Sequence, residues 1–522
     1  MDRSIEEKIE YIVTLRQIQF QLNKMKNYFF SWLIALSFIL ISTSAKTPTY
    51  QTYQYNYENV LGTSFELKVN ASSESYANYS EQLALDEIDR LNNILSTYNA
   101  NSEISRWLKT YNTEEKISPE LFEVFILFDQ WKEKTNGALN ASAAIASNLW
   151  KRASSNQRLP EKEELDRAVD AMNQSQWILN TGQQTAIHLS LQPLALNSFV
   201  NSYIIKKVSN KVMSISGVRG AVINIGGDII VAGDRKETIH VADPMTNAEN
   251  GIPLAQLKLQ NKAIATSGNY RRGFQIGTQW FSHILDARTA MPVSEIISAT
   301  VVSNEATDAG ALATAFNILS PKESAALAAS IPGVEFQIIT KTGEEIVSDG
   351  WRALQSNGKS LIDNKQKSSA GEDKFEAAIN LELARFEGRF HRPFVAVWVE
   401  NKKKESVRNV VVWFNKPRWL PELKRWFSKN QSVSQDHSTM GSISSATRSA
   451  GKYALVWNGL DDVGKPVPSG KYTIYIEAAR EHGTYQLMKQ DIDWKGKRNH
   501  FDLDGGVEIT SASIDLHQKS GN

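Results

Sequence analysis

The stretch Ala221–Asp228 reads AVINIGGD, and it predicts a buried strand that ends in a turn. Its valine and isoleucines are β-branched and apolar, so they fit the surface of a sheet. Gly226 and Gly227 follow, and glycine takes backbone angles that are closed to other residues and lets another molecule approach the main chain closely. Because the chain resumes as IIVAG, the stretch indicates either a tight hairpin or the floor of a ligand pocket.

Apolar segments on both sides of this stretch predict further strands, because their residues fit a pleated sheet. These segments cover residues 58–69, 228–233, 238–243, 254–260, 262–266, 299–303 and 334–340. Amphipathic segments predict helices, namely one capped by Ser80, one begun by Ser118 and Pro119, and others at 161–172, 196–215 and 305–319. We therefore expect an α+β fold over residues 58–350, with helices packed on a mainly antiparallel sheet.

The rest of the chain predicts a linker and a second domain. Residues 351–374 are mostly polar and are typical of a linker. Beyond them, residues 375–522 contain short strands joined by turns such as LDDVGKPVPSGKY at 460–472. This pattern is typical of a small all-β sandwich.

Composition excludes several classes of function. The 58 Lys and Arg residues balance the 57 Asp and Glu residues, so we expect no nucleic-acid partner. The chain has no cysteine. A disulfide framework, a thiol nucleophile, a cysteine zinc site and a lipoprotein anchor are therefore excluded.

The N-terminus predicts export. Lys24 and Lys26 precede the apolar run YFFSWLIALSFILI at 28–41, and small residues follow it up to Ala45. A positive start, an apolar core of roughly 7–15 residues and small exit residues predict a signal peptide within residues 1–45. Cleavage is expected after Ala45, and Met25 is a candidate for the true start. An uncleaved anchor is the alternative.

Three loops of the first domain carry polar residues that a plain sheet does not need. They are 226–228, 266–268 and the loop that holds His283 and Asp286. Each loop follows an apolar strand, so we expect all three at one edge of the sheet. A lone histidine is more often structural than functional, but three such loops together favour a site.

Six motifs in order carry a resemblance to a known family. They are LGTSFELKV, LSTYNANSEIS, NIGGDIIVAG, AIATSGNYRR, HILDARTAMP and DAGALATAFNIL. As a set they resemble the FAD:protein FMN transferase family, the ApbE-like flavin transferases. The resemblance implies an exported, Mg²⁺-dependent enzyme that splits FAD and attaches FMN, through a phosphoester, to a threonine of an acceptor protein. The tail is similar to an uncharacterised periplasmic module, so we expect the protein in the periplasm or on the periplasmic face of the inner membrane.

The resemblance also implies roles for individual residues. The expected Mg²⁺ ligands are the backbone carbonyl of Ser198, the side chain of Thr314 and Asp308, which is the nearest carboxylate. His283 and Asp286 are the expected catalytic residues that shape the transfer site. The expected contacts of the FAD substrate are Tyr98, Ala138, Leu139, Asn140, Gly226, Gly227, Asp228 and Ser267.

Several departures from the family's pattern remove charge. The family has an aspartate four residues before its threonine, where this chain has Gly310. Asp308 lies six residues before Thr314 and so on another helix face, unless the helix is distorted. Asn201 replaces a flavin-contacting lysine, and Ala195 replaces an aspartate. Such charges stabilise a transition state strongly. The first hypothesis is an active transferase. The second is a catalytically degenerate flavin-binding or docking protein of envelope electron transfer. The third is a structural module in which the tail is the working part.

The tail contains a stretch related to the acceptor motif of the family's targets. Those targets carry a Ser-Gly-Ala-Thr-like sequence, and residues 444–447 read SSAT. Thr447 is therefore a candidate for the residue that is modified or docked. The alternative is an ordinary serine-rich loop before a strand.

Overall fold

The computed structural model describes most of the chain after residue 48. The described residues are 14, 16, 18–26, 49–245, 250, 253–269, 272–356, 375–414, 417–430, 444–445, 448, 450–481 and 483–518. The chain forms two units, Met1–Thr49 and Tyr50–Asn522. In the described part of the chain, no helix is both long and apolar enough to span a membrane. The apolar run at 28–41 and Thr447 lie outside the described residues.

A large sheet forms the centre of the first domain, and its strands follow the order β1-β2-β6-β7-β10-β15-β16-β17. The strands are β1 (Gln51–Val60), β2 (Thr63–Ala71), β6 (Val218–Ile225), β7 (Asp228–Gly233), β10 (Lys262–Gly268), β15 (Ile296–Ser303), β16 (Glu335–Thr340) and β17 (Glu345–Val347). Every neighbouring pair is antiparallel. The α+β prediction and its mainly antiparallel sheet are confirmed.

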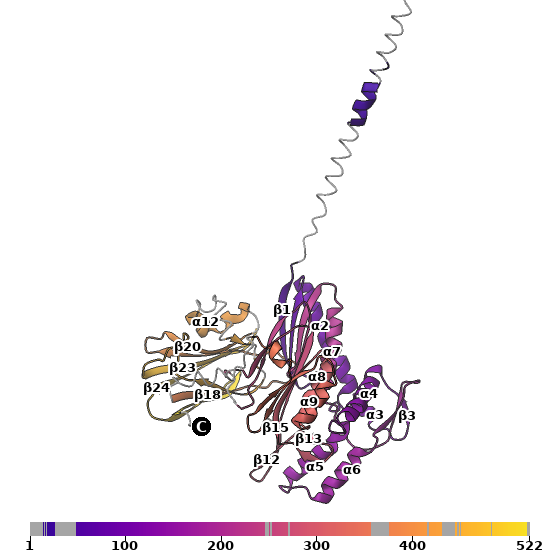
Figure 1. The fold of residues 1–522 in the computed structure, drawn as a ribbon. Helices are drawn as coiled ribbons and strands as arrows, with labels where there is room; N and C mark the ends of the chain where they lie inside the picture. Colours follow the sequence, from indigo (N-terminus) through magenta and orange to yellow (C-terminus); the bar gives the residue numbers. More distant parts are fainter. Residues whose placement is uncertain are drawn as a thin grey trace, which may run out of the picture. The chain divides into compact units, whose positions relative to one another are not determined.

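Helices cover one face of this sheet, as Figure 1 shows. They are α2 (Glu74–Leu95), α7 (Val200–Met213), α8 (Ala306–Phe316) and α9 (Pro321–Ala329). Apolar residues of these helices and alternate residues of the strands, such as Ile223 and Val301, form the main core. Because side chains alternate across a strand, Val222 and Val302 point to the opposite face. There they pack with β8 (Glu237–Val241), β9 (Ala255–Leu259) and α10 (Trp351–Leu354).

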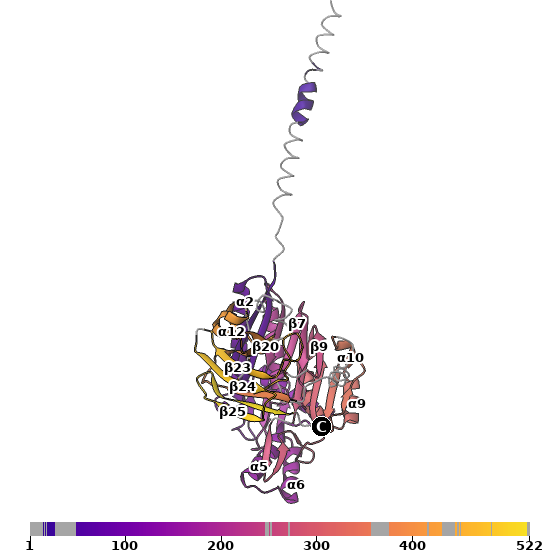
Figure 2. The ribbon, with the colours of Figure 1, turned by 90° about the vertical axis from the view of Figure 1, so that its left-hand side faces the viewer.

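A smaller group of elements surrounds the helix α4. Figure 2 shows α5 and α6 side by side in this group. Its members are α3 (Glu103–Trp107), β3 (Glu114–Lys116), α4 (Pro119–Lys134), η1 (Ala141–Ala143), α5 (Ala144–Ser155), α6 (Lys162–Asn173), β4 (Trp177–Asn180), β5 (Thr185–His188), β11 (Gly273–Ile276), β12 (Gln279–Ser282), β13 (Leu285–Asp286) and β14 (Met291–Pro292). Ala287 and Ala290 pack against α5 and α6 in one cluster, so these helices support the loop between His283 and Pro292.

The second domain has two sheets, with the strand orders β22-β18-β26-β25 and β21-β20-β19-β23-β24. Its elements are β18 (Phe375–Leu383), β19 (Phe394–Asn401), β20 (Ser406–Trp413), η2 (Pro417–Glu422), α12 (Lys424–Lys429), β21 (Ser444–Ser445), β22 (Gly451–Trp457), β23 (Gly470–Ala479), β24 (Tyr485–Trp494), β25 (Asn499–Leu503) and β26 (Ile509–Gln518). Apolar residues from both sheets share one core. The expected all-β domain is confirmed.

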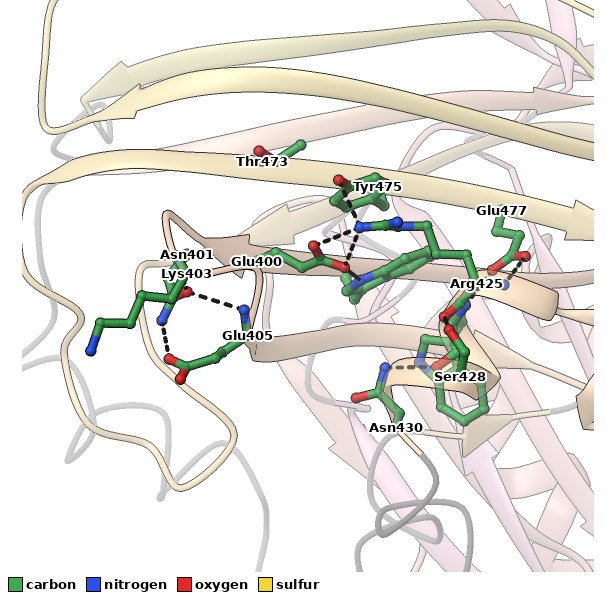
Figure 3. Close-up of polar contacts among 12 residues, drawn as sticks. Glu400, Asn401, Lys403, Glu405, Arg425, Ser428, Asn430, Thr473, Tyr475 and Glu477 are labelled. Carbon is green, nitrogen blue, oxygen red and sulfur yellow. Dashed lines mark hydrogen bonds and ion pairs between the residues drawn. The ribbon is translucent and has the colours of Figure 1, made fainter.

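The short helix α12 is held on the outer face of the second sheet by two buried carboxylates (Figure 3). Arg425 donates to both oxygens of Glu400 and to the hydroxyl of Tyr475. The carboxylate of Glu477 accepts the backbone N–H groups of Arg425 and Trp426. Because the first N–H groups of a helix have no partner within it, Glu477 acts as a cap supplied from the sheet. These hydrogen bonds fix α12 on the sheet.

The two domains contact each other within the second unit. The backbone of Glu58 in β1 pairs with Phe390, and Arg392 donates to the Glu58 carboxylate at 2.5 Å. The amide of Asn59 donates to the carbonyls of Phe386 and Gly388. The loop before β19 therefore binds the end of β1, next to the turn that leads into β2.

Two helix boundaries differ from the predictions. The cap of α2 is Ser73, whose hydroxyl accepts from the N–H of Tyr76, and Ser80 lies buried inside the helix. The apolar face extends back to Ala77, one heptad before Ala84, and this earlier start was missed. The helix expected from residue 196 begins at Val200, because a turn at residues 197–199 separates the buried Leu196 from it.

Candidate active site

The helices α7 and α8 face each other through small residues spaced four apart. The Thr314 hydroxyl donates to the carbonyl oxygen of Ser198 at 3.0 Å. One turn away, a Cβ atom on Gly310 would lie only 2.1 Å from the Ser202 hydroxyl oxygen. Ser198 lies in the turn before α7, whereas Gly310 and Thr314 lie one turn apart on the same face of α8, so the two contacts follow each other along α8. The structure thus brings together Ser198 and Thr314, two of the three expected metal ligands.

The Gly-Gly turn joins the same cluster. Gly226 and Gly227 have φ angles of 63° and 106°, and the pair Ile225–Asp228 closes the hairpin around them. Two central residues with positive φ form the preferred turn of a two-residue hairpin. Ser202 donates to the Asp228 carboxylate at 2.5 Å, which places the start of β7 against α7. The stretch is therefore both a tight hairpin and part of the helix-pair cluster.

Burial dominates the chemistry of Asp228. It raises the pKa of this carboxyl from 3.8 to about 6, and the hydrogen bond from Ser202 opposes the shift. No lysine, arginine or histidine among the described residues forms an ion pair with Asp228. A carboxylate in this position is held in place but is poorly compensated.

Asp308 lies apart from the Thr314 hydroxyl. The helix α8 is regular from Ala306 to Phe316, so Gly310 does not bend it. Asp308 occupies the first turn and, being six residues before Thr314, faces another way. Burial raises the pKa of its carboxyl, and the charge of nearby Lys134 lowers it. The structure does not bring Asp308 to the Ser198–Thr314 pair.

The loop after α4 lies beside the turn before α7. The Ala195 N–H donates to the Ala141 carbonyl at 2.7 Å. Ala138 and Leu139 are buried. The Asn140 side chain is also buried, since its amide donates to the Met172 carbonyl and its oxygen accepts the N–H of Ser142. The side chains of this segment are thus occupied within the protein.

Tyr98, unlike these residues, has a free side chain surface. Its side chain is 89% exposed, in the loop after α2. An exposed aromatic ring offers a face on which a planar ring system can stack.

The loop from His283 to Pro292 contains two separate polar groups. His283 is exposed, its Nδ1 hydrogen bonds to the Arg272 carbonyl at 3.0 Å, and burial by its surroundings lowers its pKa. A carbonyl only accepts, so Nδ1 carries the proton and Nε2 is the free base. Asp286 does not contact His283. Its carboxylate instead receives two bonds from the Arg288 guanidinium and one from the Arg288 N–H.

Ser267 marks the end of β10. Its carbonyl accepts from the Asn317 amide at 2.9 Å, which ties β10 to the end of α8. A groove of about 540 Å³ begins beside Asn317 and runs along Asp286 and Thr289. The loop at 266–268 and Asp286 thus lie near the end of α8, whereas the Gly-Gly turn contacts α7 through Ser202.

Residues 61–338, more than half of the chain, match the ApbE family. The chain belongs to the ApbE family. Residues 376–511 match a second family, described as a predicted periplasmic protein (DUF2271).

Named relatives match the same ApbE region. A FAD:protein FMN transferase of Vibrio cholerae is 24% identical over 307 residues, which cover 57% of this chain and 90% of the relative. One of Escherichia coli is 26% identical over 279 residues, which cover 50% of this chain and 76% of the relative. The crystal structure of an ApbE protein from Thermotoga maritima superposes with a TM-score of 0.53 at 21% identity. That superposition covers 59% of this chain and all of that one, and it shows the fold.

The ApbE site offers Mg²⁺ two suitable oxygens. Ligands in adjacent positions of an octahedron lie about 3 Å apart when each is about 2.1 Å from Mg²⁺. The 3.0 Å between the Thr314 hydroxyl and the Ser198 carbonyl fits this spacing. Both groups are neutral, however. In the described part of the chain, no three or more His, Cys, Asp or Glu side chains gather as a metal site.

Two residues that organise the ApbE site were missed from the sequence. Ser202 links Gly310 to Asp228, and Asn317 links β10 to α8. The signal for Ser202 was available, since a helix was expected at 196–215, where Ser198 and Ser202 have the same spacing of four as Gly310 and Thr314. Asn317 had no comparable signal, because its role depends on where β10 ends.

Proposed function

We propose that this protein transfers FMN from FAD to a threonine hydroxyl of an acceptor protein in the cell envelope, with Mg²⁺ as the cofactor. The observation that carries the proposal is the match of its ApbE domain to named FAD:protein FMN transferases over most of their length. The contacts of Ser198 with Thr314 and of Asp228 with Ser202, at the α7–α8 pair, support it.

The reaction exchanges a phosphoanhydride bond for a phosphoester bond. The acceptor hydroxyl oxygen attacks the phosphorus on the FMN side of the FAD pyrophosphate. A new P–O bond forms to the threonine, the P–O bond to the AMP phosphate breaks, and AMP leaves with that oxygen. The hydroxyl proton passes to a base. The products are protein-bound FMN and AMP.

His283 is the base that we assign to this step. Its Nε2 has no hydrogen-bond partner in the described residues, and its lowered pKa keeps the ring neutral at pH 7. A neutral imidazole within reach of a hydroxyl accepts its proton in the transition state. Asp286 acts on the loop instead, because Arg288 occupies its carboxylate.

Ser198 and Thr314 are the residues that would hold Mg²⁺, which neutralises pyrophosphate oxygens when bound. Gly227 has no atom within 4 Å of a would-be Cβ, so its backbone is open to a substrate. Tyr98 offers an exposed ring for the isoalloxazine. These groups would position FAD so that its pyrophosphate lies near the helix pair.

The acceptor and the location follow from the same comparison. We assign an acceptor with a Ser-Gly-Ala-Thr-like stretch, and Thr447 of this chain is one candidate. The match of the tail to a family described as periplasmic supports export to the periplasm or the periplasmic face of the inner membrane.

A second function is favoured by one observation. Position 310 has no carboxylate, and the two ligand oxygens are neutral. A site without negative charge binds Mg²⁺ weakly, so a degenerate protein that binds FAD without splitting it is the alternative.

One incubation separates the two functions. The protein is mixed with FAD, Mg²⁺ and an acceptor peptide, and AMP is quantified while the peptide and the protein are weighed by mass spectrometry. Transfer gives AMP and a flavin adduct in equal amounts. Retention of FAD without AMP would establish the binding function instead. If the protein neither releases AMP nor retains FAD, the tail is left as the working part.

A further inference from the structure

Asp228 has too few partners for a carboxylate in its surroundings. Its one hydrogen bond comes from the Ser202 hydroxyl at 2.5 Å, and no cationic side chain of the described residues pairs with it. Its side chain is half-buried, and desolvation raises its pKa to about 6. Charges removed from water in this way are normally paired or bind metals. A cation beside Asp228 would satisfy this requirement.

The position of Asp228 relative to the ligand oxygens is set by Ser202 and Gly310. The Ser202 oxygen lies 2.1 Å from the place of a Cβ on Gly310 and 2.5 Å from an Asp228 oxygen. The Asp228 carboxylate therefore lies within a side chain's reach of Gly310, and Thr314 is the next residue on that face of α8. Asp228 thus places a carboxylate about one helical turn along α8 from Thr314, although position 310 itself carries none.

We propose that the Asp228 carboxylate is the acidic ligand of a Mg²⁺ site completed by the Thr314 hydroxyl and the Ser198 carbonyl, with Ser202 holding it in place. The proposal rests on the transferase function above and supplies the negative charge that function needs. The Asp228 carboxylate brings the hard, charged oxygen that Mg²⁺ prefers to the neutral pair. The acidic ligand in this chain thus comes from the glycine hairpin, whereas position 310 on α8 carries no carboxylate.

Asp308 is the competing carboxylate. It shares α8 with Thr314 but faces another way, toward the charges of Lys134, Glu305 and Lys206. The two lysines compensate its negative charge in part, and the charge of Glu305 opposes them. Asp228 has no such neighbours, so the two aspartates make a matched pair for a test.

The test measures metal binding apart from catalysis. Mn²⁺ replaces Mg²⁺, and its free concentration is followed by electron paramagnetic resonance as it is titrated into the full chain. D228N keeps the shape of the side chain and its bond to Ser202 but removes the charge. We expect D228N to weaken Mn²⁺ binding by at least about tenfold, and D308N to change it by less than about twofold. Unchanged binding by D228N, loss by D308N, or no binding by the unaltered chain would overturn the proposal.

A rescue variant guards against misfolding as the cause. S202G removes the atom that blocks position 310, and G310D then places a carboxylate four residues before Thr314. We expect S202G/G310D in the D228N background to recover Mn²⁺ binding. The rise in Tm on adding Mg²⁺ should be lost in D228N and return in the triple variant, because a ligand stabilises only the form that binds it. Failure of the triple variant to bind, while it melts cooperatively, would contradict the proposal.

The outcomes also separate this proposal from the proposed function. If the chain releases AMP from FAD and D228N retains both Mn²⁺ binding and AMP release, the ligand assignment fails and the function stands. If Mn²⁺ binding depends on Asp228 but AMP never appears, the ligand assignment stands and the transferase function fails.

Discussion

At the scale of single residues, the site depends on complementary sizes. Ser202 on α7 fills the space beside Gly310 on α8, so one side chain serves two helices. A glycine inside a helix costs about 1 kcal/mol relative to alanine. The contact explains why this chain has glycine at position 310, because any Cβ would meet the serine hydroxyl.

A substitution at Gly310 tests this packing. We expect G310A to destabilise the protein by about 1–3 kcal/mol, because overpacking outweighs the gain in helix propensity. In the S202G background the same change should stabilise by up to about 1 kcal/mol. Urea unfolding of the four proteins, with EDTA present, measures the coupling between the two sites. Equal effects in both backgrounds would contradict the contact.

The role of His283 predicts a pH profile. Its pKa is lowered from 6.5, so the ring is neutral at and above pH 7 and gains a proton as the pH falls below 6.5. A protonated ring accepts no proton from the acceptor. Transfer should therefore be constant above neutral pH and decline below 6.5. H283Q should lower the rate by about 10²- to 10⁴-fold and abolish this decline.

His240 provides the matched control for this profile. Burial lowers its pKa in the same direction, but it lies in β8 on the other face of the sheet. H240Q should leave both the rate and its pH dependence unchanged. A similar loss in H240Q, or a normal rate in H283Q, would remove His283 from the reaction.

At the scale of elements, the strands were largely predictable from the sequence, whereas the site was not. Alternating β-branched residues identified β6 and β7, and Ser118 with Pro119 identified the start of α4. Short polar elements such as α3 and β25 carry too few apolar residues for a periodic signal. The link from Asp228 to Ser202 depends on how two distant segments pack, which local pattern does not encode.

The β6–β7 turn offers a prediction at this scale. A Cβ on Gly226 would lie 2.9 Å from Thr63 in addition to sitting at a positive φ. Gly343, in the β16–β17 hairpin, has a φ of 82° and open space around it. We expect G343A to cost about 1–2 kcal/mol from backbone strain alone, and G226A to cost more. Chemical denaturation of both variants measures the difference in stability. An equal loss of stability would show that the Thr63 side chain moves aside for the new Cβ.

At the scale of the whole molecule, a buried ion pair joins the two domains. The Glu58 and Arg392 side chains are 6% and 8% exposed. Their pairing lies at the end of β1, immediately before Leu61 and Gly62, which turn with φ angles of 54° and 71° into β2. The second domain therefore helps to fix the strand that enters the first motif of the ApbE region.

Removing one partner of this pair tests the contact. We expect E58Q to destabilise the protein by about 1–3 kcal/mol, because it removes the buried carboxylate to which Arg392 donates. The control is D166N, which breaks the exposed Lys162–Asp166 pair and should cost much less, because exposed ion pairs contribute little. Scanning calorimetry of both variants gives the comparison. A loss in E58Q no larger than in D166N would contradict a fixed contact between the domains.

The most direct test of FMN transfer is to follow the phosphorus atoms of FAD. The protein, FAD, Mg²⁺ and an acceptor peptide are observed together by ³¹P nuclear magnetic resonance. We expect the two pyrophosphate signals to decay while an AMP phosphomonoester and a peptide-bound phosphodiester appear in equal amounts. Unchanged pyrophosphate signals, or their conversion to AMP and free FMN without a phosphodiester, would contradict the transfer of FMN by this protein.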